Sequence, residues 1–469
     1  MRVVLGRELR ACELSLMLGA TLPFCKGSDP TVRAICTDSR EADASTAFVA
    51  LCGERVDGHD YIGAATERGC PVVIAQRADS RYAESSAVLM LVEDTEAALA
   101  TLARAYLSGL SHSTVAVTGS VGKTTTKDMI HSVLQEGREC FCSSGNHNSV
   151  IGMPLCALEL NEKYDCAVFE MGMSARGEIE RMSLCARPDI AVITNVGTSH
   201  MEMLGSRENI RDAKMEIARG VREGGILLLN GDEPLLREGE SVGCRRLYVS
   251  LFDEQADFFA KNISIENECT CFDAYWKDGC LEGLCLSVVG RHNVYAGLFA
   301  LAVGLLLGAT EEEIRRGLRA YTPHGLRQSI CHYKDITLIE DCYNASPESM
   351  RASLDVLALT ARGRRIACLG EMLELGENAH RFHREVGAYA ARVGADLLFC
   401  IGRGGEWIAE GAIESGLPAN RVMSAPDREE IGVLCKSLCT CLEGTDTVLI
   451  KGSRGVRLER VIEYLKSNY

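Results

Sequence analysis

The chain has no continuous apolar run of about 18 residues or more, the length that a membrane-spanning helix requires. Its 22 cysteines include no C-x-x-C pair and are scattered, so neither a disulfide framework nor a common zinc spacing is indicated. The 50 lysines and arginines are fewer than the 65 aspartates and glutamates. The formal net charge of −15 argues against a general nucleic-acid binder, which needs a basic face. Any anionic ligand must therefore be met by local cations.

The N-terminal stretch "MRVVLGRELRACELSLMLGA" lacks the features of a secretory signal. Glu8 and Glu13 interrupt its apolar positions, and no small-residue cleavage site follows a continuous apolar core. We therefore expect a cytoplasmic protein with no membrane span.

One group of cysteines is denser than the rest, in "ECTCFDAYWKDGCLEGLC". It contains Cys269, Cys271, Cys280 and Cys285. The alternation of apolar and polar residues around "KDG" predicts a β-hairpin in preference to a metal site.

Three zones differ in their pattern, which agrees with a prior of about 150 residues for each domain. Residues 1–112 mix short strands with helices, and they end in the helical stretch "DTEAALATLARAYL". Residues 113–322 alternate apolar strands such as "STVAVTG", "DCAVFEMG" and "DIAVITNVG" with helices. Residues 323–469 repeat that rhythm with "ITLIEDCY", "DLLFCIG" and "DTVLIKGSRG". The last two zones predict mostly parallel sheets covered on both faces, with ligands at the carboxyl ends of the strands.

The stretch "VTGSVGKTTTKDM" resembles a phosphate-binding loop with one departure. Val117 stands where the pattern G-x-x-x-x-G-K-[ST] demands its first glycine. A predicted strand nevertheless precedes the loop and a predicted helix follows it. Backbone N–H groups and a helix N-terminus hold phosphate in such a context, with Lys123 as the counter-charge and Thr124 on Mg²⁺. The context favours a phosphate site over an ordinary turn.

Two polar residues follow the next predicted strands. Glu170 ends "DCAVFEMGM", and a carboxylate buried at a strand end is costly unless it meets a cation, such as a phosphate-bound Mg²⁺. A salt bridge in a loop is the alternative. His200 follows "DIAVITNVGTSH" at the same sheet edge and is a candidate for metal or phosphate. Lys214, in "SRENIRDAKMEIARG", reads by itself as part of a solvated helix face.

A set of motifs in a fixed order resembles the Mur ligases of bacterial peptidoglycan synthesis. The motifs include "TDSR", "VTGSVGKTTT", "GNHNSVIGMPL", "TNVGTSHMEMLGS", "DAKMEI", "GRHNVYAG", "DCYNASPESM" and "IKGSRGVRLE". The family loop also lacks a glycine at the position of Val117. The resemblance implies an α/β protein of three domains: a mixed α/β N-terminal domain for the UDP-substrate (1–112), a central P-loop-type ATPase domain with a mostly parallel sheet (113–322), and a Rossmann-like C-terminal domain (323–469).

The resemblance also implies roles for particular residues, with ATP and Mg²⁺ as cofactors. The implied ATP-binding residues are Gly119, Ser120, Val121, Gly122, Lys123, Thr124, Thr125, Asn293, Arg327 and Asp341. The implied catalytic residues are Lys123, Glu170, His200 and Lys214, and the implied metal ligands are Thr124, Glu170, His200 and Lys214, with Lys214 carbamylated by CO₂. The implied substrate-binding residues are Ser39, Arg40, Asn148, Asn344 and Ser346.

The acceptor follows from narrower features of the resemblance. "DCYNASPESM" and "LGEMLELGE" resemble the members that join D-alanyl-D-alanine to UDP-N-acetylmuramoyl-tripeptide, and a D-N-P-R-like stretch of the third-residue-adding members is missing. A Mur-type ligase for another acceptor, third-residue-adding or folylpolyglutamate-like, is the alternative. A turn built by Asn-x-Ser-Pro would explain Asn344 and Ser346 equally well. We expect a monomer that binds no nucleic acid.

Overall fold

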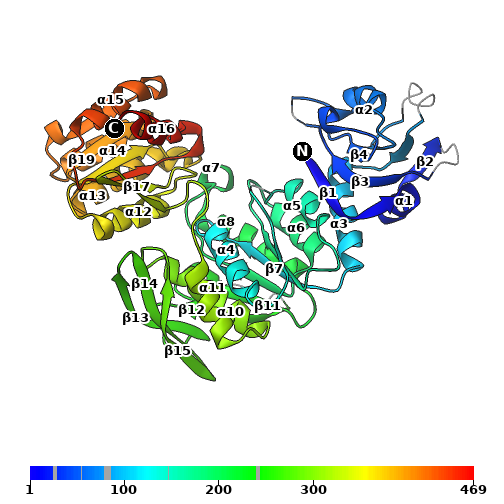
Figure 1. The fold of residues 1–469 in the computed structure, drawn as a ribbon, viewed down its shortest axis with the longest axis horizontal. Helices are drawn as coiled ribbons and strands as arrows, with labels where there is room; N and C mark the ends of the chain where they lie inside the picture. The colour runs from blue at the N-terminus through cyan, green and yellow to red at the C-terminus, as the bar shows by residue number, and fades with distance from the viewer. Residues whose placement is uncertain (25–28, 54, 79–85, 146, 239–242) are drawn as a thin grey trace.

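The computed structural model describes residues 1–24, 29–53, 55–78, 86–145, 147–238 and 243–469. The chain forms three α/β bodies in an open V, with the N-terminal and C-terminal bodies as the two arms (Figure 1). The predicted boundaries at residues 112 and 322 fall between the three sheets and remain predictions. Asn146 of the "GNHNS" motif lies outside the described residues.

The N-terminal body has a six-stranded sheet in the order β1-β3-β4-β5-β6-β2. Pairs from β3 to β6 are parallel, and the two outer pairs are antiparallel. Its strands are β1 Arg2–Arg10, β2 Thr21–Phe24, β3 Thr31–Cys36, β4 Thr46–Val49, β5 Val72–Ala75 and β6 Val88–Leu91. Its helices are α1 Ala11–Leu18, α2 Ile62–Glu67 and α3 Thr95–Ser108.

The central body has a nine-stranded sheet in the order β15-β14-β13-β12-β11-β10-β7-β9-β8. It is parallel from β8 to β13 and ends in antiparallel β14 and β15. The strands are β7 Ser113–Thr118, β8 Cys140–Cys142, β9 Cys166–Glu170, β10 Ile190–Ile193, β11 Ile226–Asn230, β12 Arg245–Ser250, β13 Phe258–Glu266, β14 Cys269–Trp276 and β15 Gly279–Leu286. The helices are α4 Lys123–Leu134, α5 Gly152–Ala157, α6 Glu178–Ala186, α7 Met201–Leu204, α8 Arg207–Met215, α9 Pro234–Arg237, α10 Asn293–Leu306 and α11 Glu311–Ala320.

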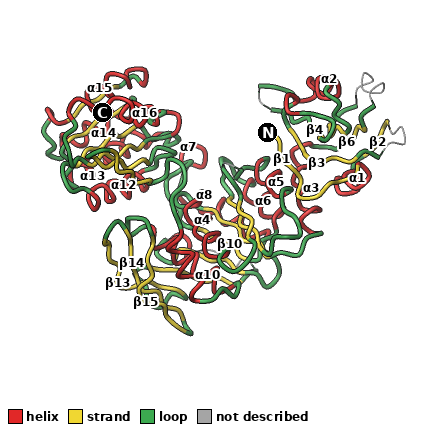
Figure 2. Tube along the Cα trace, viewed as in Figure 1, coloured by secondary structure: helices red, strands yellow, loops and turns green. Residues whose placement is uncertain are grey.

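The C-terminal body has a six-stranded sheet in the order β16-β17-β21-β18-β19-β20, parallel except for β16. Helices lie on both faces of the strands (Figure 2). The strands are β16 Ser329–Tyr333, β17 Ile336–Glu340, β18 Arg365–Gly370, β19 Leu397–Ile401, β20 Val422–Ala425 and β21 Thr447–Lys451. The helices are α12 Pro347–Thr360, α13 Ala379–Arg392, α14 Arg403–Glu414, α15 Ile431–Cys441 and α16 Glu459–Asn468.

The period of two along β7 divides the central core into two layers. Val115 and Val117 pack with α4 and α10, whereas Ala116 packs on the opposite face with α3, α5 and α6. Both faces of the strand are therefore apolar, as a parallel sheet covered by helices requires. The inner face of α4 is apolar as well, because Met129, Ile130, Val133 and Leu134 are all buried.

The cysteine-rich hairpin forms as predicted by β14 and β15, and it adds a feature that the sequence did not indicate. Cys271 and Cys285 lie opposite each other in the register and form a disulfide. Cross-strand neighbours lie close enough for such a bond.

Among the helices that the structure describes, none has the length and apolarity needed to cross a bilayer.

Helix α11 packs unusually close to α4. A Cβ added to Gly317 would lie 2.4 Å from Cα of Val133, so only glycine permits this approach. We expect Gly317→Ala to destabilise the central body by about 1–3 kcal/mol through overpacking. Gly432→Ala, in α15, is the matched control, because its Cβ would meet nothing within 4 Å. The control should stabilise by up to about 1 kcal/mol. Thermal and denaturant unfolding measure both, and equal midpoints for the two variants would refute the close-packing argument.

Candidate active site

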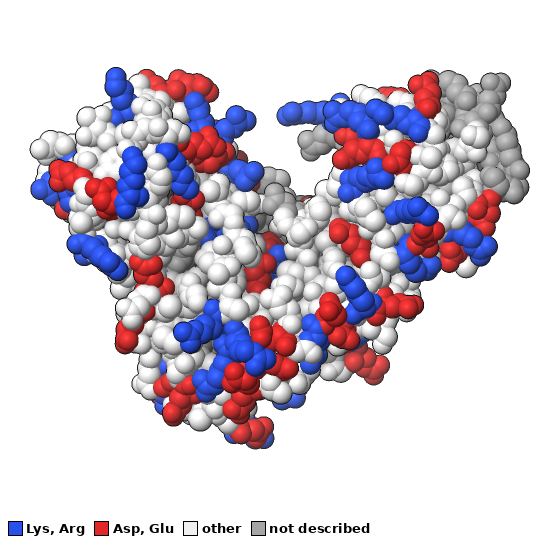
Figure 3. Space-filling model, viewed as in Figure 1, with Lys and Arg blue, Asp and Glu red and all other residues white. Residues whose placement is uncertain are grey.

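A cavity of about 520 Å³ lies where the central and C-terminal bodies meet. Figure 3 shows the molecule hollowed between its two arms. Most of the predicted site residues line this cavity: Ser120, Val121, Gly122, Lys123, Thr124, Thr125, Asn148, Glu170, His200, Asn293, Arg327, Asp341, Asn344 and Ser346. The carboxyl ends of β7, β9 and β10 meet here, as expected for a ligand site in a parallel sheet.

The departure at Val117 has a structural reason. Val117 is a fully buried residue of β7, one position before the strand ends, so the tight loop begins only at Gly119. A Cβ on Gly119 would lie 1.9 Å from Oγ1 of Thr194, which makes glycine necessary there. Gly122 has φ +80°, in the left-handed region that glycine adopts readily. The loop therefore needs its glycines at 119 and 122.

The N-terminus of α4 is open toward the cavity. Gly122 is the N-cap and supplies no side-chain cap to the first turn. The amides of that turn have no intrahelical partner and carry the positive end of the helix dipole. An anion such as a phosphate group satisfies them.

Asn195 braces the loop, and sequence reasoning missed it. Its Oδ1 accepts hydrogen bonds from the amides of Ser120 at 3.1 Å and Val121 at 2.9 Å, and its Nδ2 donates to the carbonyl of Val121 at 3.0 Å. The loop is thus held in shape by the residue that follows β10 by two positions. The sequence did offer an indication of this role, because Asn195 stands in "ITNVG", just after β10, the strand that pairs with β7.

Lys123 begins α4 and bends back over the loop. Its Nζ donates to the carbonyls of Gly119 at 2.8 Å and Ser120 at 3.3 Å. Desolvation lowers the pKa of this lysine, whereas the nearby Glu170 raises it. An anionic phosphate in the cavity would supply the counter-charge that carbonyl oxygens provide only in part.

Glu170 is buried at the end of β9, as predicted, and it is the centre of a small network. Thr124 Oγ1 donates to Oε2 at 2.7 Å, and Asn148 Nδ2 donates to Oε1 at 2.9 Å. The hydroxyl and the carboxylate offer adjacent oxygen ligands, the donor type that Mg²⁺ prefers. The residues present therefore fit a hard divalent cation at this position.

His200 lines the cavity but is directed to the C-terminal body. Its Nδ1 lies 2.7 Å from Oε2 of Glu374, and this contact lowers the pKa of that carboxyl. Its backbone has φ +64°. A second bridge lies beside it: Thr198 donates through its amide and its hydroxyl to Oε1 of Glu348, each at 3.0 Å. Both bridges connect the strand end of β10 to the C-terminal body.

Lys214 is not on a solvated face, which corrects the reading of its helix taken by itself. It is 1% exposed on α8, and it does not line the cavity. Burial lowers its pKa well below the ordinary value, and the charge of Lys123 lowers it further. The expected single helix also divides, because α8 ends at Met215 and a 3-10 turn follows over Glu216–Gly220. The sequence could not reveal this burial, because it depends on how α8 docks.

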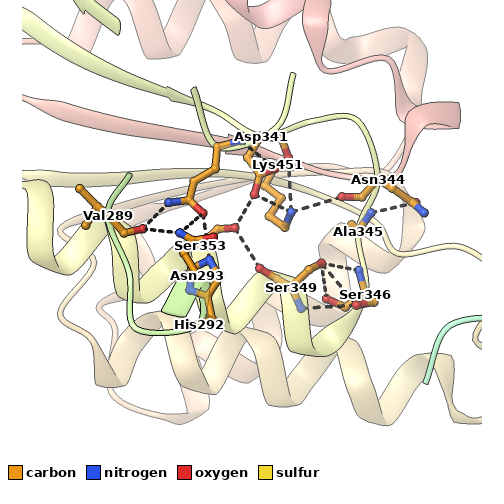
Figure 4. A network of polar contacts seen from close by, with 11 residues as sticks. Val289, His292, Asn293, Asp341, Asn344, Ala345, Ser346, Ser349, Ser353 and Lys451 are labelled. Carbon is orange, nitrogen blue, oxygen red and sulfur yellow. Dashed lines mark hydrogen bonds and ion pairs between the residues drawn. The ribbon is translucent and has the colours of Figure 1, made fainter. Parts of the chain in front are cut away.

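A polar network covers the cavity from the C-terminal body (Figure 4). Lys451 Nζ donates to Oδ2 of Asp341 at 2.7 Å and to the carbonyl of Asn344 at 3.2 Å. Ser353 Oγ also donates to Oδ2 of Asp341, at 2.5 Å. Lys451 is 2% exposed and was not predicted as a site residue, although it lies in the quoted "IKGSRG". The available indication was its position at the end of β21, the strand that pairs with β17 in the sheet.

Three further predicted residues lie around this network. Ser346 is the N-cap of α12, and its Oγ accepts from the amide of Ser349, so its hydroxyl has a structural task. Asn293 donates from Nδ2 to the carbonyl of Val289 at 2.9 Å. The Arg327 guanidinium lies 3.9 Å from the centre of the Tyr343 ring.

Ser39 and Arg40 lie elsewhere, in a 3-10 turn of the N-terminal body. Ser39 is buried, whereas the Arg40 side chain is exposed and is paired with Asp38 at 2.6 Å. They do not line the cavity between the central and C-terminal bodies.

Comparison with known proteins supports a single family along the chain. Residues 117–304 match the Mur ligase middle domain, residues 327–454 the Mur ligase glutamate ligase domain, and residues 31–107 the catalytic domain of the Mur ligase family. Over 451 residues the chain is 37% identical to the UDP-N-acetylmuramoyl-tripeptide--D-alanyl-D-alanine ligase of Bacillus subtilis (strain 168), with 96% of each chain covered.

Solved structures agree with this result. MurF from Acinetobacter baumannii superposes with a TM-score of 0.89 at 28% identity, covering 99% of this chain and 100% of that one. MurF ligase from Thermotoga maritima, in complex with ADP, has a TM-score of 0.82 at 32% identity and covers 92% and 97%. The fold and cavity define a nucleotide-binding α/β protein with a P-loop-type central sheet. The chain belongs to the Mur ligase family, in its UDP-N-acetylmuramoyl-tripeptide--D-alanyl-D-alanine ligase branch.

The brace at Asn195 can be tested directly. Asn195→Ala leaves the amide of Val121 without its acceptor and the amide of Ser120 with only the backbone carbonyl of residue 195, so the loop should lose its preset shape. Loss of such bonds costs about 1–3 kcal/mol, so we expect ADP affinity to fall by roughly tenfold to a hundredfold. Isothermal titration calorimetry measures the affinity. Asn161→Ala is the control, because the Asn161 side chain accepts from the amide of Lys163 in a distant turn. Equal ADP affinity in both variants would contradict the bracing role.

Proposed function

We propose that the protein is an ATP-dependent amide ligase that joins D-alanyl-D-alanine to UDP-N-acetylmuramoyl-tripeptide, with UDP-N-acetylmuramoyl-pentapeptide, ADP and phosphate as products. The observation that carries the proposal is the Thr124–Glu170 pair beside an open helix N-terminus, in a chain that matches named ligases over nearly its full length. The geometry is suited to a nucleoside triphosphate and a divalent cation in one cavity.

The first step activates a carboxylate. An amine does not displace oxide from a carboxylate, so the terminal carboxylate oxygen of the tripeptide attacks the γ-phosphorus of ATP and ADP leaves, which yields an acyl phosphate. The chain's part is positioning and charge neutralisation. Lys123 and the first-turn amides of α4 hold the phosphate oxygens.

The second step forms the amide. The amine of D-alanyl-D-alanine attacks the acyl carbon, a tetrahedral intermediate forms, the amine loses a proton, and phosphate leaves. Water competes with the amine, so the cavity must be closed meanwhile. Thr198–Glu348 is a contact through which the C-terminal body closes on the site.

We assign the cation site to Thr124 and Glu170, with His200 as a further ligand once it leaves Glu374. Mg²⁺ bound there would neutralise charge on the transferred phosphoryl group. Asn293, Arg327 and Asp341 are assigned to the nucleotide, and Asn148, Asn344 and Ser346 to the peptide substrates. We assign Ser39 and Arg40 to the uridine nucleotide.

We also propose that Lys214 carries a carbamate. Burial lowers the pKa of its amine well below the ordinary value, which favours the neutral form that can act as a nucleophile. The nitrogen adds to the carbon of CO₂ and loses one proton, which leaves a negative N-carboxylate near Lys123. The N-carboxylate is attracted by the charge of Lys123, whereas an ammonium at this position would be repelled by it.

Cellular context follows from the substrates. ATP and uridine nucleotides are highly charged and do not cross a bilayer unaided, so we infer that the protein works in the cytoplasm. We also propose that the protein acts as a monomer.

The acceptor is tested by phosphate release with ATP, UDP-N-acetylmuramoyl-tripeptide and a panel of amines. We expect release that depends on D-alanyl-D-alanine. Turnover with lysine or diaminopimelate, and none with the dipeptide, would instead support the alternative of a Mur-type ligase for another acceptor. The UDP-linked dipeptide, offered with the same amines, separates these two readings.

The role of Lys214 is tested by Lys214→Ala and by Lys214→Met, which keeps most of the buried apolar stem. We expect both to abolish turnover while ADP binding stays measurable, because the P-loop is unchanged. Exposed Lys163→Ala is the control and should retain full turnover. Turnover at the wild-type rate in Lys214→Met would remove this residue from the mechanism.

A further inference from the structure

Three side chains with metal-binding atoms converge beside α5, outside the cavity described above. His147 lies in the loop before α5, Cys156 lies in the last turn of α5, and Glu159 follows its end. One ligand atom from each lies within 4.8 Å of the other two. Cys156 is fully buried, whereas His147 and Glu159 are half-buried, so an ion can reach the group from solvent.

We propose that His147, Cys156 and Glu159 form a site for a Zn²⁺-like transition-metal ion. A thiolate, an imidazole and a carboxylate are the ligand types that Zn²⁺ takes, and three protein ligands leave a fourth position for water. Soft thiolate also disfavours Mg²⁺, which separates this site from the oxygen ligands at Glu170.

The distances between the three ligand atoms allow them to bind one metal ion after small side-chain movements. Zinc–ligand bonds of about 2.0–2.3 Å in tetrahedral geometry place neighbouring ligand atoms roughly 3.3–3.6 Å apart. The three atoms, within 4.8 Å now, need to approach by about 1.5 Å at most. Half-buried His147 and Glu159 have the side-chain freedom for this movement.

The polar atoms of this group are poorly satisfied without an ion. His147 Nδ1 is buried and has no hydrogen-bond partner within the described part of the chain. No hydrogen bond or ion pair holds the Glu159 carboxylate among the described residues, and burial raises its pKa. Burial likewise raises the pKa of the Cys156 thiol to about 12 and lowers the pKa of His147. Burying such groups without partners costs free energy, which a bound cation offsets.

A second group with similar chemistry shows the contrast. Cys52, Asp57 and His59 also lie within 4.8 Å of one another. There His59 Nε2 accepts from the amide of Gln76, which leaves the proton on Nδ1, and Nδ1 lies 2.7 Å from Asp57. The imidazole and carboxylate are thus already bonded to each other, so this group needs no metal.

The proposed ion would act on the neighbouring catalytic region. His147 directly precedes Asn148, whose Nδ2 bonds Glu170 and whose carbonyl accepts from the amide of Gly172 at 2.8 Å. An ion that ties His147 to the end of α5 would therefore fix the segment that presents Asn148 to Glu170. Binding displaces the Cys156 proton to solvent, one for each ion bound.

The test uses the metal-stripped full-length chain, titrated with Zn²⁺ against a chromophoric chelator and with Co²⁺ by absorption. We expect a thiolate-to-cobalt charge-transfer band, and a Zn²⁺ stoichiometry that falls by one site per chain in Cys156→Ser and in His147→Ala. Glu159→Gln should lower the Zn²⁺ stoichiometry in the same way. Because Glu159 is half-buried, this variant still tests the site if Cys156→Ser fails to fold. The band needs a sulfur ligand, so ions at Thr124 and Glu170 do not produce it.

Two control variants locate the signal. Cys185→Ser removes another buried cysteine, on α6, and should change neither the band nor the stoichiometry. Cys52→Ser should also leave both unchanged. The proposal is overturned if Cys156→Ser, His147→Ala and Glu159→Gln all bind Zn²⁺ like the wild type, or if Cys52→Ser alone removes the band. Neither result bears on the ligase reaction, which phosphate release measures separately.

Discussion

The buried Glu170 carboxylate is the interaction on which the rest of the site depends. It ends β9, it accepts from Thr124 in the first turn of α4, and it accepts from Asn148 in the loop before α5. A charge removed from water must be paired or fully hydrogen-bonded, so three separate segments have to meet at this point. That requirement brings the loop before α4, the end of β9 and the loop before α5 together at one cavity.

The second constraint is the contact between the central body and the C-terminal body. Each bridge joins the segment after β10 to the C-terminal body: Glu348 accepts from Thr198, and Glu374 meets His200. These carboxylates lie beside the cavity and not within the core of either body. Gln328 of the C-terminal body adds further contacts, because its side-chain amide donates to the carbonyl of Val289 and accepts from Asn293 of the central body.

The sequence predicted the order of strands and helices well, because period and composition are local properties. β7, β9 and β10 coincide with the apolar runs quoted from the sequence, and the hairpin of β14 and β15 forms around its predicted turn. Glu170 was recognised because a carboxylate at the end of a buried strand is costly. Asn195 and Lys451 were missed, because their partners are backbone groups and side chains distant in the sequence.

The sequence by itself determined the three-domain α/β class and the family, since both depend on short motifs and on their order. The tertiary structure alone decided that Lys214 is buried, that His200 meets Glu374 and that His147, Cys156 and Glu159 converge. These outcomes depend on how helices and bodies dock, so residues far apart in sequence set the burial and electrostatics of each group. No local pattern encodes such distances.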